Sequence, residues 1–308
     1  AKDNAWGPAH EIGHIHQLAI DWPSSTESSN NLFSNFILYK LGKYCSRGTE
    51  LNFPKAADNR TTNSEGNITG MTLSEAHCVL NRPWCNFGSN YQGENTELHM
   101  RMNWQLWNYY HRCGHKTDFW QRLFKLMREN RTSSNNPGVK QLLFARMASE
   151  AAQEDLTEFF EMWGFFVTVD TQIDQYGSYQ YTVTKEMIEN AKKAMAKYPK
   201  KAKPFYYLED RKKGDIGLDT TPPDVGHYTQ FQRIRPITKD IKGNINGREV
   251  SITNGDEAVA FELREKDANG KLLYFSTFIK FEVPLTVSLT YAKLYAVQAD
   301  GKRILLEE

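Results

Sequence analysis

The chain has 308 residues, with 38 basic and 37 acidic side chains and a formal net charge of +1. Its length suffices for two domains, and its ordinary hydrophobic (40%) and charged (24%) contents argue against intrinsic disorder. Because the charge is balanced and no apolar run approaches the roughly 18 residues of a membrane span, we expect no nucleic-acid partner and no transmembrane segment.

Helical patterns dominate residues 1–200. A first helix is predicted over Pro8–Trp22, because proline suits a first helical turn and another proline follows the last residue. A second is predicted over Ser24–Gly42 from apolar residues at helical spacing. Residues 45–97 are rich in Asn, Gly, Ser and Thr and predict long loops, which often shape substrate binding beside a site. Further helices are predicted over Leu98–His111, Asp118–Asn130, Val139–Ala151 and Asp155–Trp163, with a last one from Thr184.

The pattern changes after the basic, proline-containing run Lys197–Pro204, which predicts a linker. Alternating segments such as Ala258–Leu263 and Leu272–Phe278 then predict strands. Turn signals separate these strands at regular intervals, at Gly243–Gly247, Asn254-Gly255, Asn269-Gly270 and Asp300-Gly301. We therefore expect an α+β multidomain chain, with a mainly α-helical domain over residues 1–200 and an antiparallel β-sandwich over residues 205–308.

The clearest functional signal is the HExxH motif that begins at His10 on the first predicted helix. Residues four apart share one face of a helix, so the imidazoles of His10 and His14 can converge on one Zn²⁺. Glu11 lies beside the metal position and can act as general base, taking a proton from the attacking water and passing it to the leaving amine. Gly13 costs about 1 kcal/mol in a helix relative to alanine, which suggests close backbone packing near the metal.

A catalytic zinc ion needs a third protein ligand and an open position, and Glu27 is the candidate for that ligand. The first predicted helix ends before Glu27, the chain reverses, and Glu27 falls in the first turn of the next helix, where it can face the metal. The alternative is that Glu27 closes a capping box that begins at Ser24 and needs no metal. His16 points away from the His10–His14 face. Another histidine or a tyrosine is expected to stabilise the oxyanion, and the sequence leaves its identity open.

The four cysteines, Cys45, Cys78, Cys85 and Cys113, form no CxxC pair, so they predict no structural zinc site. Cys78 and Cys85 flank a short loop and are compatible with a disulfide in an oxidising compartment. Free buried thiols are an equal alternative.

Three stretches together resemble the enhancin-like, mucin-degrading zinc metallopeptidases (metallopeptidase family sixty) of gut bacteria and some insect viruses. The first is Trp6–Gln17 with Glu27-Ser-Ser-Asn-Asn31 downstream, which is similar to the family's HExxH, spacer, glutamate and following asparagines. The second is Met102–Leu106, and the third is Phe144–Ala152 leading into Asp155–Gly164. The resemblance covers residues 1 to about 165.

The resemblance implies a gluzincin-like catalytic domain, secretion or anchoring at the bacterial cell surface, and proteolysis of O-glycosylated host proteins such as mucins. It also implies recognition of the glycan beside the scissile bond. His10, His14 and Glu27 carry over as Zn²⁺ ligands and Glu11 as general base. Because the family's catalytic domain has a β-rich portion before the zinc helix, we expect this chain to be N-terminally truncated.

Two other functions stay open. The chain could be a glycan- or mucin-binding surface adhesin that keeps the peptidase fold but cleaves little. Aromatic residues at the start of the predicted β-sandwich either stack on sugars or fill the core of a spacer: Tyr206, Tyr207, Tyr228 and Phe231. The second alternative is a peptidase for unglycosylated protein or cell-wall peptide. The sequence indicates no oligomeric state.

Overall fold

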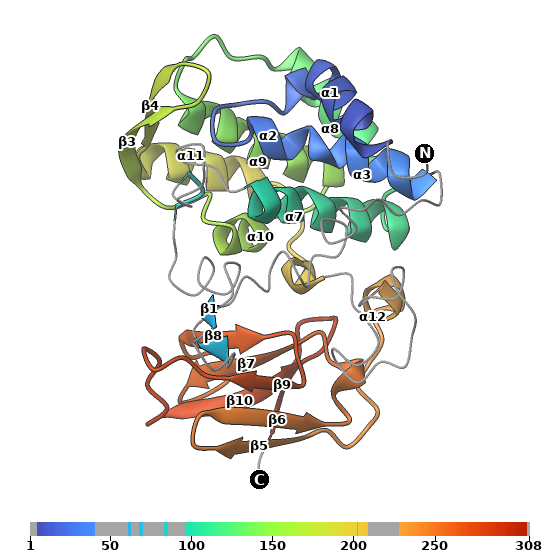
Figure 1. Ribbon diagram of the computed structural model, residues 1–308, viewed down its shortest axis with the longest axis vertical. Coiled ribbons are helices and arrows are strands. Elements are labelled where there is room, and N and C mark those ends of the chain that lie inside the picture. Colours follow the sequence, from blue (N-terminus) through green and yellow to red (C-terminus); the bar gives the residue numbers. More distant parts are fainter. Residues whose placement is uncertain are drawn as a thin grey trace. The chain divides into compact units, whose positions relative to one another are not determined.

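The computed structural model describes residues 5–40, 61–62, 68–69, 83–85, 96–201, 203–208 and 228–306. The chain divides into two units, the first made of residues 1–51 and 81–201 and the second of residues 52–80 and 202–308. Among the described helices, none is both long and apolar enough to cross a membrane. Helices make up most of the first unit and antiparallel sheets most of the second (Figure 1).

The first unit is built around buried helices. These elements are α1 (Trp6–His16), the 3-10 turn η1 (Gln17–Ala19), α2 (Thr26–Ser29), α3 (Asn31–Lys40), α7 (Thr96–Trp107), the π-helical turn η2 (Asn108–Arg112), α8 (Phe119–Glu129), α9 (Pro137–Ala152), α10 (Thr157–Met162) and α11 (Lys185–Met195). Helix α9 starts at an Asn136 cap, whose side chain accepts a hydrogen bond from the Gly138 N–H, and has Pro137 in its first turn. All predicted helices after residue 97 are present, with shifted ends.

The two helices predicted nearest the motif are shorter than expected. The α-helix over Pro8–Trp22 begins at Trp6, ends at His16 and tightens into η1, because the chain must turn inward to bury Trp22 against Phe144. The helix over Ser24–Gly42 is broken into α2 and α3. The Asn31 side chain donates to the Glu27 carbonyl at 2.8 Å, the group that would accept the backbone N–H of Asn31 in a continuous helix.

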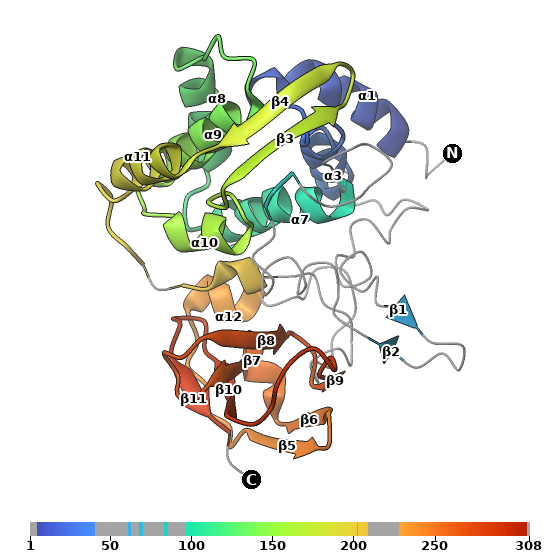
Figure 2. The same cartoon turned by 90° about the vertical axis from the view of Figure 1, so that its left-hand side faces the viewer.

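A β-hairpin in the first unit was not predicted from the sequence. Strands β3 (Val169–Asp174) and β4 (Ser178–Val183) pair in antiparallel register, with Asp174 opposite Ser178 at the closed end. The hairpin runs along α9 (Figure 2), and a Cβ on Gly138 of that helix would lie 2.2 Å from the Thr182 carbonyl oxygen. Its buried residues join a core with α9 and α11: Ile173, Tyr181, Val183, Leu142, Ile188 and Ala191.

The second unit contains two larger antiparallel sheets that share one hydrophobic core. One has the order β11-β10-β7-β8 and the other β5-β6-β9. The elements are β1 (Thr61–Thr62), β2 (Ile68–Thr69), η3 (Phe205–Tyr207), α12 (Tyr228–Arg233), β5 (Lys242–Asn246), β6 (Glu249–Thr253), η4 (Gly255–Glu257), β7 (Ala260–Glu265), β8 (Leu272–Ser276), β9 (Lys280–Glu282), β10 (Ala292–Val297) and β11 (Arg303–Leu305). Val250 and Ile252 of β6 pack in the same core as Phe261 and Leu263 of β7. Residues Gly243–Asn246 were expected to form a turn but belong to strand β5. The chain reverses one residue later, at Gly247, which has a φ of +61°.

Two of the four cysteines lie in the described residues. Cys85 and Cys113 are buried and neither forms a disulfide, so the alternative of a disulfide between Cys78 and Cys85 is not realised. Burial raises the pKa of each thiol to about 12. Cys45 and Cys78 lie outside the described residues.

Candidate metal centre

Three side chains from α1 and α2 meet at one point of the first unit. The donor atoms of His10, His14 and Glu27 all lie within 4.8 Å of one another. Glu27 Oε2 is 3.5 Å from His10 Nε2 and 3.7 Å from His14 Nε2. The structure therefore brings together the three residues that the sequence analysis names as ligands, and their role as ligands stays a prediction.

Helix α1 places both histidines on this face because it approaches the following chain very closely. Gly13 is buried, and a Cβ at this position would lie 2.5 Å from the Asn30 carbonyl oxygen. That distance is shorter than real Cβ contacts, so only glycine permits the approach. His10 and His14 flank Gly13 in the helix and are thus held against the segment that carries Glu27.

The orientation of His10 is fixed by two neighbours. Its Nδ1 lies 2.7 Å from Asn31 Oδ1, and its ring stacks on Trp6 with centroids 4.9 Å apart. Because Asn31 Nδ2 donates to the Glu27 carbonyl, Asn31 Oδ1 is the acceptor, and His10 must carry its proton on Nδ1. Nε2 is then the nitrogen that carries the lone pair, and it lies on the side of Glu27.

The side chain of Asn30 marks the point on which both rings converge. Its Nδ2 lies 3.1 Å from His10 Nε2 and 2.9 Å from His14 Nε2. Asn30 is fully buried, and its Oδ1 has no hydrogen-bond partner among the described residues. His14 Nδ1 is contacted on its other side by the buried Gln17 amide at 3.3 Å. The Asn30 amide thus lies close to the Nε2 atoms of both rings.

Glu27 is 9% exposed, and its carboxylate contacts the side chains of His10, His14 and Tyr176. The capping-box alternative is wrong, because the Ser24 N–H that Glu27 would bind donates to Gln175 Oε1 at 2.6 Å instead. Glu27 Oε2 faces the histidines, while its Oε1 accepts a hydrogen bond from the Tyr176 hydroxyl at 2.6 Å. Tyr176 and Gln175 were not predicted from the sequence; the turn at Gly177 and the alternating residues of β4 were the signals for the hairpin that carries them.

This donor set fits a catalytic zinc ion. Two imidazole nitrogens and one carboxylate are the protein ligands of the His₂Glu class of hydrolytic zinc sites, which keep a further position for water or substrate. A largely buried carboxylate such as that of Glu27 is also costly unless a cation or hydrogen-bond donors compensate its charge. His10, His14 and Glu27 would hold the ion, with Asn31 and Gln17 against the outer nitrogens of the two rings.

Glu11, the predicted general base, is exposed on α1 next to His10. The other histidines of the described residues lie elsewhere. His16 packs near Phe33 with ring centroids 6.0 Å apart, and His99 is fully buried, with Nε2 2.8 Å from the Trp84 carbonyl oxygen. His77 and His227 lie outside the described residues.

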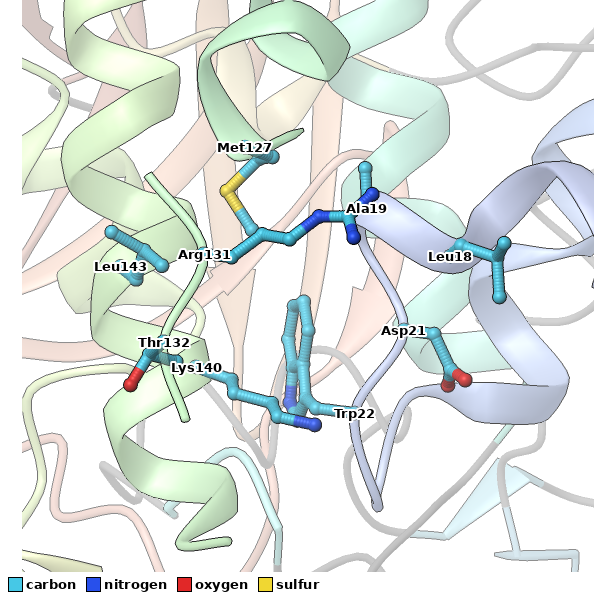
Figure 3. A pocket seen from close by; sticks show the side chains of 9 residues that line it. All are labelled: Leu18, Ala19, Asp21, Trp22, Met127, Arg131, Thr132, Lys140 and Leu143. Carbon is cyan, nitrogen blue, oxygen red and sulfur yellow. The ribbon is translucent and has the colours of Figure 1, made fainter. Parts of the chain in front are cut away.

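A cavity of about 270 Å³ lies in the first unit, beside the residues that come directly after α1. Arg131 and Lys140 reach into it near Trp22, with Asp21 on the side of η1 (Figure 3). The remaining lining residues are Leu18, Ala19, Met127, Thr132 and Leu143. The three predicted ligands are not among them, so the metal centre is defined by converging side chains and not by this cavity.

The comparisons with known proteins agree with this geometry. The family model described as peptidase M60, enhancin and enhancin-like, matches residues 1–164, which include all three converging side chains. The model of the peptidase M60 C-terminal domain matches residues 240–305. The chain belongs to the enhancin-like M60 peptidase family. Membership implies a metal cofactor, in agreement with the donor set.

Solved structures of metallopeptidases resemble this chain over nearly its full length. A metallopeptidase from Bacteroides thetaiotaomicron is 57% identical, with a TM-score of 0.81 over 99% of this chain and 50% of that one. A metallopeptidase in complex with Tn antigen has the same identity and TM-score over 99% of this chain and 55% of that one. The M60 catalytic domain of Clostridium perfringens ZmpC, in complex with the sialyl T antigen, is 17% identical with a TM-score of 0.58 over 98% of this chain and 50% of that one, which shows a shared fold.

Two more distant relatives match only about half of this chain. The TRPM8 channel-associated factor homolog of Xenopus laevis is 27% identical over 171 residues, which is 52% of this chain and 15% of that protein. TRPM8 channel-associated factor 2 of Bos taurus is 27% identical over 175 residues, with the same two coverages. This M60 chain thus spans about half the length of the solved structures above and a small part of these relatives.

The contact between Gly13 and Asn30 generates a prediction. Gly13→Ala should destabilise the first unit by about 1–3 kcal/mol and weaken zinc binding, because the added methyl group meets a backbone oxygen that cannot move aside. Gly7→Ala is the control, since a Cβ there meets nothing within 4 Å. Urea unfolding followed by tryptophan fluorescence measures the effect, because all 7 tryptophans precede residue 201. Equal stability and zinc affinity in both variants would contradict the role given to this contact.

Proposed function

We propose that this M60 chain is a zinc-dependent endopeptidase that hydrolyses peptide bonds in host glycoproteins, in particular O-glycosylated, mucin-type proteins. The observation that carries the proposal is the convergence of His10, His14 and Glu27 within a region that matches the M60 family. The mechanism needs a metal site, a base beside it and an open side, and the described residues supply candidates for the first two.

The chemistry divides between the ion and the chain. A zinc ion in such a site acts as a Lewis acid toward the scissile carbonyl and lowers the pKa of a bound water toward about 7. His10, His14 and Glu27 would hold the ion, and Asn31 would keep the Nδ1 proton of His10 in place. Glu11 takes the proton of the attacking water and passes it to the leaving amine nitrogen.

The substrate class rests on the solved relatives. One 57% identical metallopeptidase was solved with Tn antigen, and the more distant ZmpC catalytic domain with the sialyl T antigen. Both ligands are glycan antigens, which supports glycan contact by this chain as well. A glycoprotein substrate outside the cell also fits secretion or anchoring at the bacterial cell surface.

We also propose that the catalytic domain covers residues 1–200 and that a β-sandwich covers residues 205–308. The change of unit after Lys201 and the core shared by the two sheets support this division, although residues 52–80 group with the second unit. Tyr206, Tyr207 and Phe231 are buried, so they are not available to stack on sugar rings. Their burial favours a spacer over a carbohydrate-binding module and weakens the alternative of an adhesin.

The division of roles between Glu11 and Glu27 predicts different defects. Glu11→Gln should abolish cleavage while zinc stays bound, because it removes the base and leaves all ligands in place. Glu27→Ala should lower zinc affinity itself. Zinc content by atomic spectroscopy and cleavage of a glycopeptide measure the two effects. Near-normal turnover by Glu11→Gln would contradict the mechanism, and unchanged zinc affinity in Glu27→Ala would remove Glu27 from the ligand set.

The substrate proposal is tested with intact and enzymatically deglycosylated mucin, each with and without a chelator. We expect fragments, identified by mass spectrometry, from intact mucin without chelator and far fewer from the deglycosylated protein. Equal cleavage of both would favour a peptidase for unglycosylated protein. Glycan binding that survives chelation, with no cleavage of any mucin, would favour the adhesin.

A further inference from the structure

The tip of the β3–β4 hairpin touches the Glu27 segment at two adjacent residues. Gln175 Oε1 accepts a hydrogen bond from the Ser24 N–H at 2.6 Å, and the Tyr176 hydroxyl donates to Glu27 Oε1 at 2.6 Å. The hairpin and α2 are far apart in the sequence, so both contacts are long-range. Figure 2 shows the hairpin tip reaching the side of the unit where α1 lies.

The base of the hairpin is anchored, so the tip has a fixed support. Tyr181 of β4 is fully buried, and its hydroxyl lies against both Gln141 of α9 and the hydroxyl of Ser24. Ser24 thus contacts the hairpin through its backbone and its side chain. The same segment, a few residues on, carries Glu27.

Tyr176 adopts a backbone conformation that disfavours its own side chain. Its φ is +55°, in the left-handed region, where a bulky residue costs on the order of 1–3 kcal/mol. Glycine would be free of this cost. Tyr176 is also 72% exposed, so burial of its ring does not offset the strain. What this conformation provides is a hydroxyl that reaches the largely buried carboxylate of Glu27.

We propose that Tyr176 is a positioning residue that sets how Glu27 holds the metal; this inference rests on the proposed function. Its hydroxyl occupies Oε1 and restricts rotation of the carboxylate, which leaves Oε2 facing His10 and His14. Glu27 is then a one-oxygen ligand held in place before the ion arrives, and less ordering is needed on binding. The hairpin tip acts as a clamp on the carboxylate.

The test is zinc affinity, measured by competition with a chromophoric chelator, so that it does not depend on turnover. Tyr176→Phe removes only the hydroxyl and should weaken zinc binding by about tenfold to a hundredfold. Tyr179→Phe, in strand β4 of the same hairpin, is the matched control and should bind zinc as the unmodified chain does. In a Glu27→Ala background, Tyr176→Phe should cause no further loss, because it acts through that carboxylate.

A second variant separates positioning from stability. Tyr176→Gly removes the hydroxyl and also relieves the positive φ, so the metal-free chain should keep or raise its Tm while zinc affinity falls. If Tyr176 had a purely structural role, zinc affinity would not fall while the Tm of the metal-free chain stays the same or rises. The d–d absorption of the cobalt-substituted chain should also change in Tyr176→Phe and not in Tyr179→Phe, since it reports the geometry of the ligands.

Each outcome decides between the proposals. If Tyr176→Phe binds zinc as tightly as the unmodified chain while Glu27→Ala binds it weakly, the clamp is overturned and the metal site stands. If Glu27→Ala binds zinc as tightly as the unmodified chain, Glu27 leaves the ligand set and the clamp is overturned. If the unmodified chain binds no zinc, the proposed function itself is overturned, and the clamp with it.

Discussion

The close approach of helix α1 to the backbone at Asn30 is the contact on which the rest of the site depends. Only a glycine at position 13 permits it, since a Cβ would lie 2.5 Å from the Asn30 carbonyl oxygen. The approach sets His10 and His14 against a segment that supplies Glu27 and two asparagine side chains. A helix face with the HExxH spacing is thereby turned into a set of three converging donors.

The segment that bears Glu27 is held from two directions. Asn31 joins His10 to the Glu27 backbone on one side, and the hairpin tip joins Tyr176 to the Glu27 carboxylate on the other. Both connections depend on local departures from regular structure. The first breaks a helix between α2 and α3, and the second places a tyrosine at positive φ. Such departures gather where geometry serves function, because surrounding contacts must hold them in place.

The sequence predicted the parts of the site that depend on local periodicity. The spacing of His10 and His14, the helix that carries them and the return of the chain to Glu27 all follow from motif and turn residues. The hairpin was missed although Tyr179, Tyr181 and Val183 alternate with polar residues in β4, because β3 is mostly polar and gives that strand no apolar partner pattern. Tyr176 acts on Glu27 through a long-range contact, which no local pattern reports. The capping box was plausible from the local sequence, but the Ser24 N–H donates to Gln175 of the hairpin instead of to Glu27.

The central claim is that one zinc ion binds between α1 and α2 through nitrogen and oxygen donors. X-ray absorption at the zinc edge of the loaded chain tests it most directly. The account predicts nitrogen and oxygen ligands at about 2.0–2.1 Å, with outer-shell scattering from two imidazoles. The buried thiols of Cys85 and Cys113, whose pKa values are raised to about 12, should contribute no ligand. A sulfur shell at about 2.3 Å, or scattering that fits no imidazole, would contradict the account.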